Sequence, residues 1–422
     1  MAKISAFCGL RYDEKKLKHI NKVFAPPYDV ISSGSQKELC AAHPQNIVRL
    51  TLGKIMPSDN AKDNRYTRAA GLMKKWMDEG ILVFDEKPSL YIYTQEYTFN
   101  GKRKLRVGYF ARIELEDKGK GALAHEHTLA KPKVDRLMLT RAVEANLGPV
   151  FSFFIDKNNS VEKIFHPYLK RKPLIAFKDK DNIRHRFWKV DDKGTISRVR
   201  KAMSAKDLFI ADGHHRYEVS NQYREEIKKK GIKPGNGANY VLMYLTAFND
   251  SNLSVMPTHR LVNGVADIEG KVHLLQKYFC MEEMSGLKQL LKKQEQSAGF
   301  CLGMYYKRKF YLLTMNDEKM LDRLMKKSPQ EWRRLDVAML NQIVFAHIFK
   351  FSEKVKQEKV GYTRDIDFAV SSVNRKKAQI AFFPKVSPAE EVKKIALSGS
   401  RMPQKSTYFY PKPLTGLVIN KF

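Results

Sequence analysis

The densest group of side chains that could do chemistry lies in the segment 211–218, which reads ADGHHRYE. The short apolar stretch before it, 207–210, predicts a strand, and the charged stretch after it, 217–230, predicts a helix. A strand that ends in a glycine turn before a helix directs backbone N–H groups and the positive end of the helix dipole at one point. That arrangement suits a phosphate group, so the sequence predicts a phosphate-binding turn.

The side chains of this turn fit the role individually. Gly213 permits a close approach that a Cβ atom would obstruct, and Arg216 offers a forked, permanently charged contact. His214 and His215 could donate to phosphate oxygens, and His214 is also a candidate catalytic residue. Asp212 could cap the helix, hold a metal ion or bind a hydroxyl group. The alternative is a plain cap followed by a polar helix start, and the convergence of polar groups favours the functional interpretation.

Phosphoryl transfer also needs a base for the acceptor hydroxyl, and usually a divalent cation such as Mg²⁺. Asp29 is one candidate for this catalytic base. It follows Tyr28 in the run APPYDVI, where two prolines restrict the backbone and could fix the carboxylate at a strand edge. Tyr28 is then a candidate substrate contact. An ordinary proline-bounded turn explains the same run equally well.

Glu126 is the second candidate base, within the run His125-Glu126-His127-Thr128. His125, together with Asp135 and Arg136 downstream, could contact the substrate or support such contacts. Two histidines do not make a zinc site, and a surface ion pair is the alternative role of Glu126. The four cysteines are scattered without zinc-like spacing, so no metal site is predicted from them.

Two further segments carry basic and hydroxyl side chains. Lys405 could supply a point charge to a phosphate, and Ser406 and Thr407 could supply hydroxyl and backbone donors. The alternative is an aromatic strand with the lysine in solvent. His259 and Arg260 follow another predicted strand and could add a second basic contact, although a hydrogen-bonded structural histidine is at least as plausible. The GxxxxGK[ST] loop is lacking, so P-loop chemistry is not supported.

The elements that must position these residues alternate between strand and helix patterns without a doubly wound repeat, which predicts an α+β fold. The expected strands lie at 90–99, 107–115, 184–189, 240–248, 300–306 and 310–315, and the expected helices at 63–77 and 387–397. Asn100-Gly101 predicts a hairpin turn after the first of these strands. The preferred domain boundary lies near Pro257, which divides the chain into residues 1–258 and 259–422.

Composition limits the class of protein. The chain has 422 residues, of which 43% are hydrophobic, as in a folded protein. No apolar run approaches the roughly 18 residues that span a bilayer. The N-terminus lacks the apolar segment of a secretory signal, so we expect a cytoplasmic protein. The formal net charge of +32 attracts anionic ligands and makes nucleic acid a possible partner, although the basic residues are spread along the whole chain.

Four ordered motifs make the chain resemble domain-of-unknown-function family 1015. They are APPYDVI at 25–31, ADGHHRYE at 211–218, MPTHR at 256–260 and MPQKSTYFYPK at 402–412. That family is often labelled ParB/SpoOJ-like. The resemblance implies a ParB/sulfiredoxin-like nucleotide-binding core in residues 1–258, with a C-terminal α+β domain, 259–422, that contributes a basic strand to the site. Free serine kinases of this fold class have a similar Asp-Gly-His-His-Arg loop.

The resemblance implies that Asp212 to Arg216 bind the phosphates of a nucleotide such as ATP, ADP or CTP. Two functions are therefore expected. The first is a small-molecule phosphotransferase that acts on a hydroxylated metabolite such as an amino acid. The second is a ParB-like, nucleotide-switched DNA-binding protein, for which the sequence lacks a convincing helix-turn-helix after Tyr217.

Overall fold

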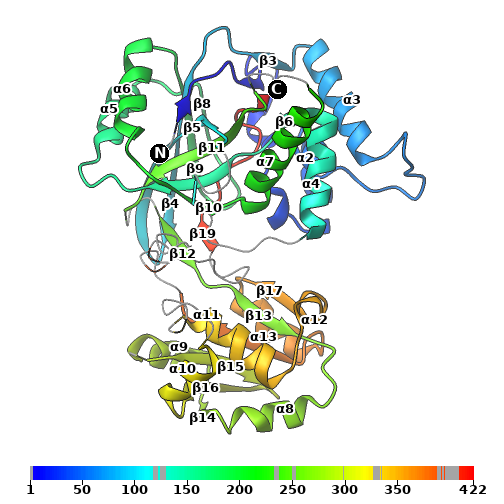
Figure 1. Cartoon of the computed structure of the whole chain (residues 1–422), viewed down its shortest axis with the longest axis vertical. Helices are drawn as coiled ribbons and strands as arrows, with labels where there is room; N and C mark the ends of the chain where they lie inside the picture. The colour runs from blue at the N-terminus through cyan, green and yellow to red at the C-terminus, as the bar shows by residue number, and fades with distance from the viewer. Residues whose placement is uncertain are drawn as a thin grey trace. The chain divides into compact units, whose positions relative to one another are not determined.

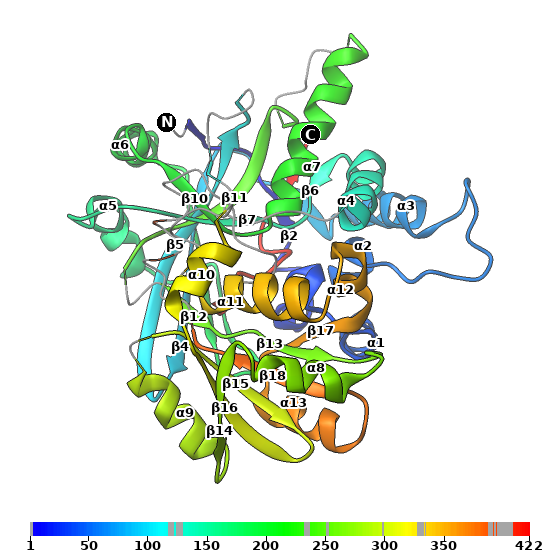
Figure 2. The same cartoon turned by 60° about the horizontal axis from the view of Figure 1, so that its bottom comes forward.

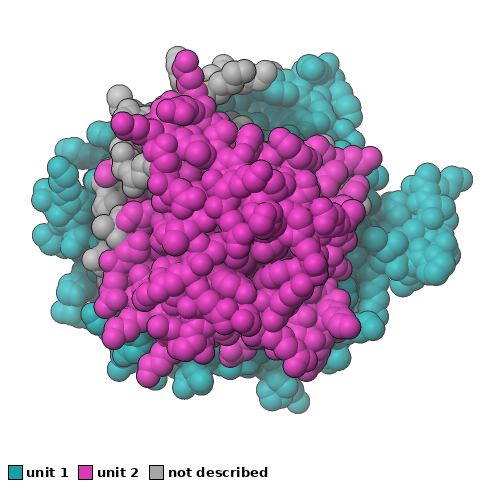
Figure 3. Space-filling model, turned by 90° about the horizontal axis from the view of Figure 1, so that it is seen from below, with its two compact units in different colours: residues 1–124, 128–254, 411–422 teal, residues 125–127, 255–410 magenta. Residues whose placement is uncertain are grey.

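The chain forms two compact units, which Figure 3 colours separately. The computed structural model describes residues 3–116, 122–123, 130–231, 237–249, 253–297, 299–326, 333, 335–386, 391, 394 and 408–422. Unit 1 comprises residues 1–124, 128–254 and 411–422, and unit 2 comprises 125–127 and 255–410. Mixed sheets with helices packed on them confirm the α+β class. The division at residue 258 stays a prediction, and the last twelve residues belong to unit 1.

Unit 1 is built on an eight-stranded sheet with the order β10-β7-β11-β5-β4-β9-β8, to which β1 adds by pairing with β5. Its strand pairs are antiparallel except β7 with β11, which run parallel. The strands of unit 1 are β1 (Ile4–Ser5), β2 (Leu10–Tyr12), β3 (Leu82–Phe84), β4 (Leu90–Phe99), β5 (Lys102–Glu114), β6 (Ala145–Asn146), β7 (Val150–Phe154), β8 (Ile175–Lys178), β9 (Arg184–Val190), β10 (Leu208–Asp212), β11 (Tyr240–Ala247) and β20 (Asn420–Lys421).

Helices α5 and α6 pack on one face of this sheet, and α7, with α4 packed against it, lies on the other (Figure 1). Nearly all residues of β4, β7 and β11 are buried, whichever face they point to. The helices of unit 1 are α1 (Ser33–Ala42), α2 (Val48–Thr51), α3 (Arg65–Asp78), α4 (Ala130–Val143), α5 (Ser160–Leu169), α6 (Lys193–Met203) and α7 (His214–Lys229), with 3₁₀ turns η1 (Ile20–Lys22) and η2 (Tyr28–Val30).

Unit 2 contains a six-stranded antiparallel sheet with the order β14-β16-β15-β18-β13-β17. Helices α9 and α13 lie on one side of it, and α11 with the π-helical segment η4 lies on the other (Figure 2). Its elements are β12 (Ser254–Met256), β13 (His259–Val262), α8 (Ile268–Leu275), β14 (Phe279–Met284), α9 (Leu287–Gln296), β15 (Cys301–Tyr306), β16 (Lys309–Met315), α10 (Glu318–Leu324), α11 (Asp336–Met339), η4 (Leu340–Ile348), α12 (Glu353–Lys359), β17 (Val360–Thr363), α13 (Ile366–Asn374), β18 (Ile380–Pro384) and β19 (Tyr408–Tyr410).

Local sequence signals account for much of this structure. The turn between β4 and β5 has positive φ at both central residues, 49° at Asn100 and 72° at Gly101, as a tight hairpin requires. Helix α3 begins with a capping box between Asn64 and Thr67. The expected helix 387–397 lies mostly outside the described residues. Among the described helices, none is long and apolar enough to cross a membrane.

Candidate functional site

The predicted turn lies between β10 and α7 in unit 1. Gly213 has φ 89° and ψ 28°, a left-handed conformation that favours glycine. Helix α7 begins at His214, three residues earlier than the sequence pattern indicates. His214, His215 and Arg216 therefore form the first turn of the helix and are not loop residues. His214 is buried with 6% of its surface exposed, and His215 is half-buried.

Arg216 folds back over the turn that precedes it. Its Nη2 donates to Asp212 Oδ2 over 2.7 Å, and its Nη1 donates to the carbonyl oxygen of Pro149. A Cβ atom at Gly213 would lie 2.9 Å from the Cζ, Nε and Nη2 atoms of Arg216. Glycine is thus favoured at this position both by its backbone angle and by the space that the guanidinium occupies.

A second cation reaches the same carboxylate from the segment Pro411–Thr415, here named the return segment because it leads the chain back into unit 1. Lys412 Nζ lies 2.5 Å from Asp212 Oδ1, and only 5% of the lysine side chain is exposed. Asp212 is therefore held between Arg216 and Lys412, and the three side chains together carry one net positive charge.

The return segment also touches the proline-rich motif near the N-terminus. Ala25 and Thr415 exchange two backbone hydrogen bonds of 3.3 and 2.8 Å. Asp29, one residue after Tyr28, is exposed. Unit 1 thus brings together three segments that are far apart in the sequence: the motif at 25–31, the turn at 211–216 and the return segment.

Tyr28 lies beside two arginines from the neighbouring helices. The guanidinium of Arg136 on α4 stacks over the Tyr28 ring at 4.0 Å from its centroid. Burial raises the pKa of Tyr28 to about 12, and the charge of Asp29 raises it too, while Arg136 and Arg216 act in the opposite direction. The phenol therefore keeps its proton at neutral pH and can donate a hydrogen bond.

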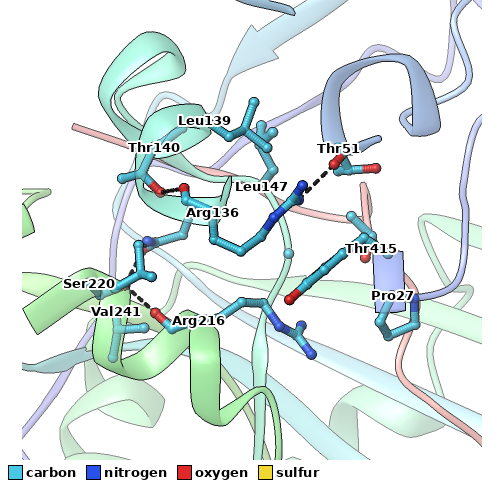
Figure 4. A pocket seen from close by; sticks show the side chains of 15 residues that line it. Pro27, Thr51, Arg136, Leu139, Thr140, Leu147, Arg216, Ser220, Val241 and Thr415 are labelled. Atoms are coloured by element: carbon cyan, nitrogen blue, oxygen red, sulfur yellow. Dashed lines mark hydrogen bonds between the residues drawn. The ribbon is translucent and has the colours of Figure 1, made fainter. Parts of the chain in front are cut away.

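A small cavity of about 50 Å³ lies between α4, α7 and these segments. Figure 4 shows Arg136 and Arg216 extending from the two helices toward the same space beside Pro27 and Thr415. By volume it holds roughly four water molecules or one compact anion. Its lining combines the two arginines with hydroxyl, amide and apolar side chains: Thr51, Thr140, Asn146, Ser220, Leu139, Leu147 and Val219.

Asp135 anchors the arginine of α4. It accepts from Arg136 Nε over 2.8 Å and from the Tyr66 hydroxyl over 2.7 Å, and it pairs with Arg65. Arg136 Nη1 donates to the carbonyl oxygen of Thr51 over 2.7 Å. Arg136 is 6% exposed, so these bonds fix its guanidinium at the cavity wall.

Two other predicted site residues belong to unit 2. His259 and Arg260 belong to β13 of unit 2, where they are 2% and 1% exposed. Burial, with the nearby Arg260 charge, lowers the pKa of His259 to about 4, so its imidazole is neutral. Its ring meets Phe383 edge-on, and neither ring nitrogen has a hydrogen-bond partner within the described residues. The roles predicted for His259 and Arg260 stay predictions.

Five predicted site residues lie outside the described residues: His125, Glu126, Lys405, Ser406 and Thr407. The lysine that reaches Asp212 was not among the sequence candidates. Lys412 stands between Pro411 and Pro413, and this restriction of the backbone on both sides was the available signal. Ser220 and Asn146 line the cavity, and no local sequence pattern distinguishes them from other polar residues.

Comparison with solved structures finds eight similar chains, and three of them show how low the identity is. A hypothetical protein from Pyrococcus furiosus is 13% identical with a TM-score of 0.37, over 71% of this chain and 90% of that one. A glutamine variant of free serine kinase in complex with AMP is 13% identical with a TM-score of 0.38, over 71% and 87%. C-terminally truncated SbnI from Staphylococcus aureus is 11% identical with a TM-score of 0.37, over 73% and 86%.

No curated protein matches the chain. The sequence profile of one family, described as "Protein of unknown function (DUF1015)", matches residues 4–338, which is more than half of the chain. The motifs at 25–31, 211–218 and 256–260 all fall within the matched residues. The chain therefore belongs to the DUF1015 family of proteins of unknown function.

Proposed function

We propose that unit 1 binds the phosphate groups of a nucleotide at the start of α7. The observation that carries this proposal is the meeting of Arg216 and Lys412 at Asp212, directly before a helix of 16 residues. The helix start adds the positive end of its dipole to a cluster whose side chains already carry a net positive charge. In this proposal Asp212 organises the two cations, and Gly213, His214 and His215 provide the surface that the phosphate approaches.

We further propose that the nucleotide, ATP, ADP or CTP, takes part in phosphoryl transfer to a small hydroxylated metabolite. Arg216 and Lys412 would neutralise charge on the transferred group, which is the main task of the protein in such reactions. Asp29 would be the base for the acceptor hydroxyl, because it is exposed beside Tyr28 and close to the cavity. Glu126 and His214 remain the other catalytic candidates, and Lys405, Ser406 and Thr407 remain candidate phosphate contacts.

A divalent cation fits this proposal only as part of the nucleotide complex. Mg²⁺ in such sites is held mainly by phosphate oxygens and water, with one or two protein carboxylates. Asp212 and Asp29 are the carboxylates that the described residues offer here, and Asp212 is already engaged by two cations. Within the described residues, no group of three potential metal-binding side chains occurs.

The test of phosphate binding is a titration of the protein with ATP, ADP and CTP by calorimetry. Arg216→Ala should weaken the affinity about tenfold or more, because a charge-assisted bidentate contact is lost. Arg141→Ala is the matched control, since Arg141 forms an exposed ion pair with Glu226 between α4 and α7. Equal nucleotide affinity in the wild type and in Arg216→Ala would refute the claim that Arg216 binds the phosphate. Transfer is then tested by following nucleotide turnover with a panel of hydroxylated metabolites.

One observation favours a second function, nucleotide-switched DNA binding: the net charge of +32. A protein that neutralises many DNA phosphates loses affinity steeply as salt concentration rises, but still binds at physiological salt. Fluorescence anisotropy with a labelled duplex at several salt concentrations separates the two functions. Loss of all binding at physiological salt would exclude the DNA function and leave the nucleotide proposal intact.

A further inference from the structure

Several hydrogen-bond donors at the wall of the cavity between α4 and α7 have no acceptor within the described residues. Arg136 uses Nε–H and one N–H on each Nη atom for its bonds to Asp135 and to the carbonyl oxygen of Thr51, which leaves a second N–H on each Nη atom. The hydroxyls of Tyr28 and Thr415 also line the cavity, and neither is hydrogen-bonded to any residue that the structure describes. Unmet donors in a buried place cost free energy, so Arg136, Tyr28 and Thr415, here called the donor group, are suited to a ligand that accepts hydrogen bonds.

The other uncharged polar side chains of the wall are already engaged with their neighbours. The hydroxyls of Thr51, Thr140 and Ser220 donate to backbone carbonyl oxygens four residues earlier, over 3.2, 2.9 and 2.9 Å. Asn146 donates to the Ser220 hydroxyl over 3.2 Å and accepts from the backbone N–H of Leu242 over 3.1 Å. Recognition of a polar ligand in the cavity therefore falls to the donor group.

The charges around the cavity sum to one positive charge. Two clusters meet there, each with a carboxylate between two cations, and each cluster carries one net positive charge. One exposed carboxylate, directly after Tyr28 in the chain, removes one of these charges. A singly charged anion therefore neutralises the surroundings of the cavity, whereas a dianion such as hydrogen phosphate overcompensates them. The groups counted are Arg65, Asp135 and Arg136, then Arg216, Asp212 and Lys412, and finally Asp29.

The size and the apolar lining of the cavity select among singly charged anions. A volume of about 50 Å³ holds roughly four water molecules, and acetate has as many heavy atoms. Leu139, Leu147, Val219 and Val241 form much of the remaining wall. Such side chains cannot hydrogen-bond to the outer oxygens of a phosphate or sulfate, but they bury a short alkyl chain favourably. A carboxylate with a short alkyl chain fits both parts of the wall.

We propose that this cavity binds a small monocarboxylate of the size of acetate or propionate. The carboxylate accepts from the N–H groups of Arg136 and from the hydroxyls of Tyr28 and Thr415, while the alkyl chain lies against the leucine and valine side chains. A planar guanidinium suits a planar carboxylate, and the bond between them is charge-assisted. All lining residues belong to unit 1, and the site does not rest on the proposed nucleotide binding.

Gly148 allows the cavity to be filled without a change of charge. It lines the cavity, and a Cβ atom there would lie 3.1 Å from Oγ1 of Thr415 and 3.7 Å from Nη1 of Arg216. Its φ is not positive, so an alanine adds no left-handed strain. The added methyl group takes about the space of one ligand atom in a cavity that holds only a few.

The first experiment uses the full-length protein without nucleotide. In a chloride buffer of constant ionic strength, the protein is dialysed against radiolabelled acetate. It should bind one acetate per chain with a dissociation constant of about 1 mM, since so small a ligand limits the affinity. Unlabelled propionate should displace the label. Acetamide has the shape of acetate without its charge, and pivalate has the charge on a bulkier chain, so each should be at least about tenfold less effective than propionate.

Two pairs of variants locate the binding. Gly148→Ala should weaken acetate binding about tenfold, whereas Gly71→Ala on α3, where an added Cβ meets nothing within 4 Å, should leave it unchanged. Arg136→Met should also weaken it about tenfold, although Asp135 keeps its pair with Arg65. Arg141→Met is the control on the same helix. If Arg136→Met does not fold, the comparison of the two alanine variants still decides.

Four outcomes would overturn the proposal. Absence of saturable acetate binding would mean that water alone meets the donor group. Displacement by acetamide as effective as that by propionate would show that charge is not recognised. Equal acetate affinity in Gly148→Ala and Gly71→Ala would place the acetate outside this cavity. Displacement by inorganic phosphate as effective as that by propionate would assign the cavity to small anions in general.

The carboxylate site and the proposed function fail independently. Calorimetric titration of the same protein with ATP, ADP and CTP reports on the nucleotide alone. Acetate binding that is lost in Gly148→Ala, in a protein that binds none of these nucleotides, would refute the proposed function and leave the carboxylate site standing. Nucleotide binding without acetate binding would do the reverse.

Discussion

The guanidinium of Arg216 lies directly over the α-carbon of Gly213, so that a Cβ atom at 213 would stand 2.9 Å from three of its atoms. The absence of a side chain at Gly213 leaves the space that the guanidinium of Arg216, from the helix that follows, occupies. Asp212 accepts from Nη2 of the same guanidinium over 2.7 Å, and the carbonyl oxygen of Pro149 accepts from Nη1, which leaves Arg216 with one well-defined orientation. This preorganisation is what a binding site for a small anion needs, because little side-chain entropy remains to be lost.

Gly213→Ala should destabilise the protein more than Gly101→Ala. Both glycines have positive φ, at 89° and 72°, so each alanine costs about 1 kcal/mol in backbone strain. Only Gly213→Ala also displaces Arg216, because nothing lies within 4 Å of a Cβ at 101. We expect this overlap to lower the free energy of unfolding of Gly213→Ala by a further ~1–2 kcal/mol. Urea unfolding of the two variants measures the difference, and equal values would show that Arg216 moves away without cost.

Lys412→Met should weaken nucleotide affinity about tenfold, since one charge-assisted contact to phosphate is lost. Arg216 remains on Asp212, so the fold should survive the substitution. Lys421→Met serves as the control, because Lys421 lies in the same C-terminal stretch but pairs with Glu144. Calorimetric titration with ADP compares the two, and a similar loss in both variants would point to a general effect of charge.

Asp212→Asn should leave two cations without their shared carboxylate. Removal of one partner of a buried ionic group typically costs about 3 kcal/mol. Inorganic phosphate should restore part of this loss, so the rise in melting temperature with added phosphate should be larger for Asp212→Asn than for the wild type. Asp156→Asn, which breaks a buried pair with Lys206 in another part of unit 1, should show no extra response. Identical phosphate responses in the two variants would contradict the anion site.

Asp336 should make unit 2 less stable as the pH rises from 4 to 6. Burial, and to a smaller extent the charge of Glu391, raises the pKa of Asp336 to about 6 against the opposing effect of Lys385. A raised folded-state pKa gives a stabilising contribution that is complete below about pH 4 and is lost as pH rises through 6.

Asp336→Asn lacks this loss, and its amide oxygen can still accept from the N–H of Lys385 as Asp336 Oδ2 does over 3.2 Å. The free energy of unfolding of the variant, relative to that of the wild type, should therefore rise by about 2 kcal/mol between pH 4 and pH 7. Urea unfolding at several pH values measures that difference. His259, whose folded-state pKa is lowered, changes stability in the opposite sense but equally in both proteins, so it cancels. Parallel pH profiles would refute the prediction.

Local patterns predicted the secondary structure where a short-range rule applies. The strand at 90–99, the strand predicted at 240–248 and found at 240–247, the hairpin at Asn100-Gly101 and helix α3 follow from periodicity and turn residues. Helix α7 begins three residues before the predicted start, because two histidines and an arginine look like loop residues when only their polarity is considered. Their helical state follows from Gly213, whose left-handed angles end the strand and begin the helix.

Polarity was a poor guide to burial within the large sheet. Gln95, Arg106 and His185 are polar strand residues that periodicity alone would place at the surface, yet each is 1% exposed or less. Gln95 and Arg106 are covered by the return segment, whose carbonyl oxygens accept from them, and the ring of His185 lies against those of Tyr93 and Phe177. They are tolerated there because each is hydrogen-bonded.

The sequence by itself determined the α+β class and the family, since these depend on neighbouring residues and ordered motifs. It also predicts an anion site at the turn 211–216, and that site stays a prediction. Only the tertiary structure decided which distant residues meet there. Lys412 reaches Asp212 across 200 positions, and Thr415 pairs with Ala25 across almost the whole chain. Such contacts depend on the order of the strands in the sheet and on the position of unit 2 in the sequence, between residues 254 and 411 of unit 1. Side-chain periodicity records which face is buried but not which partner covers it.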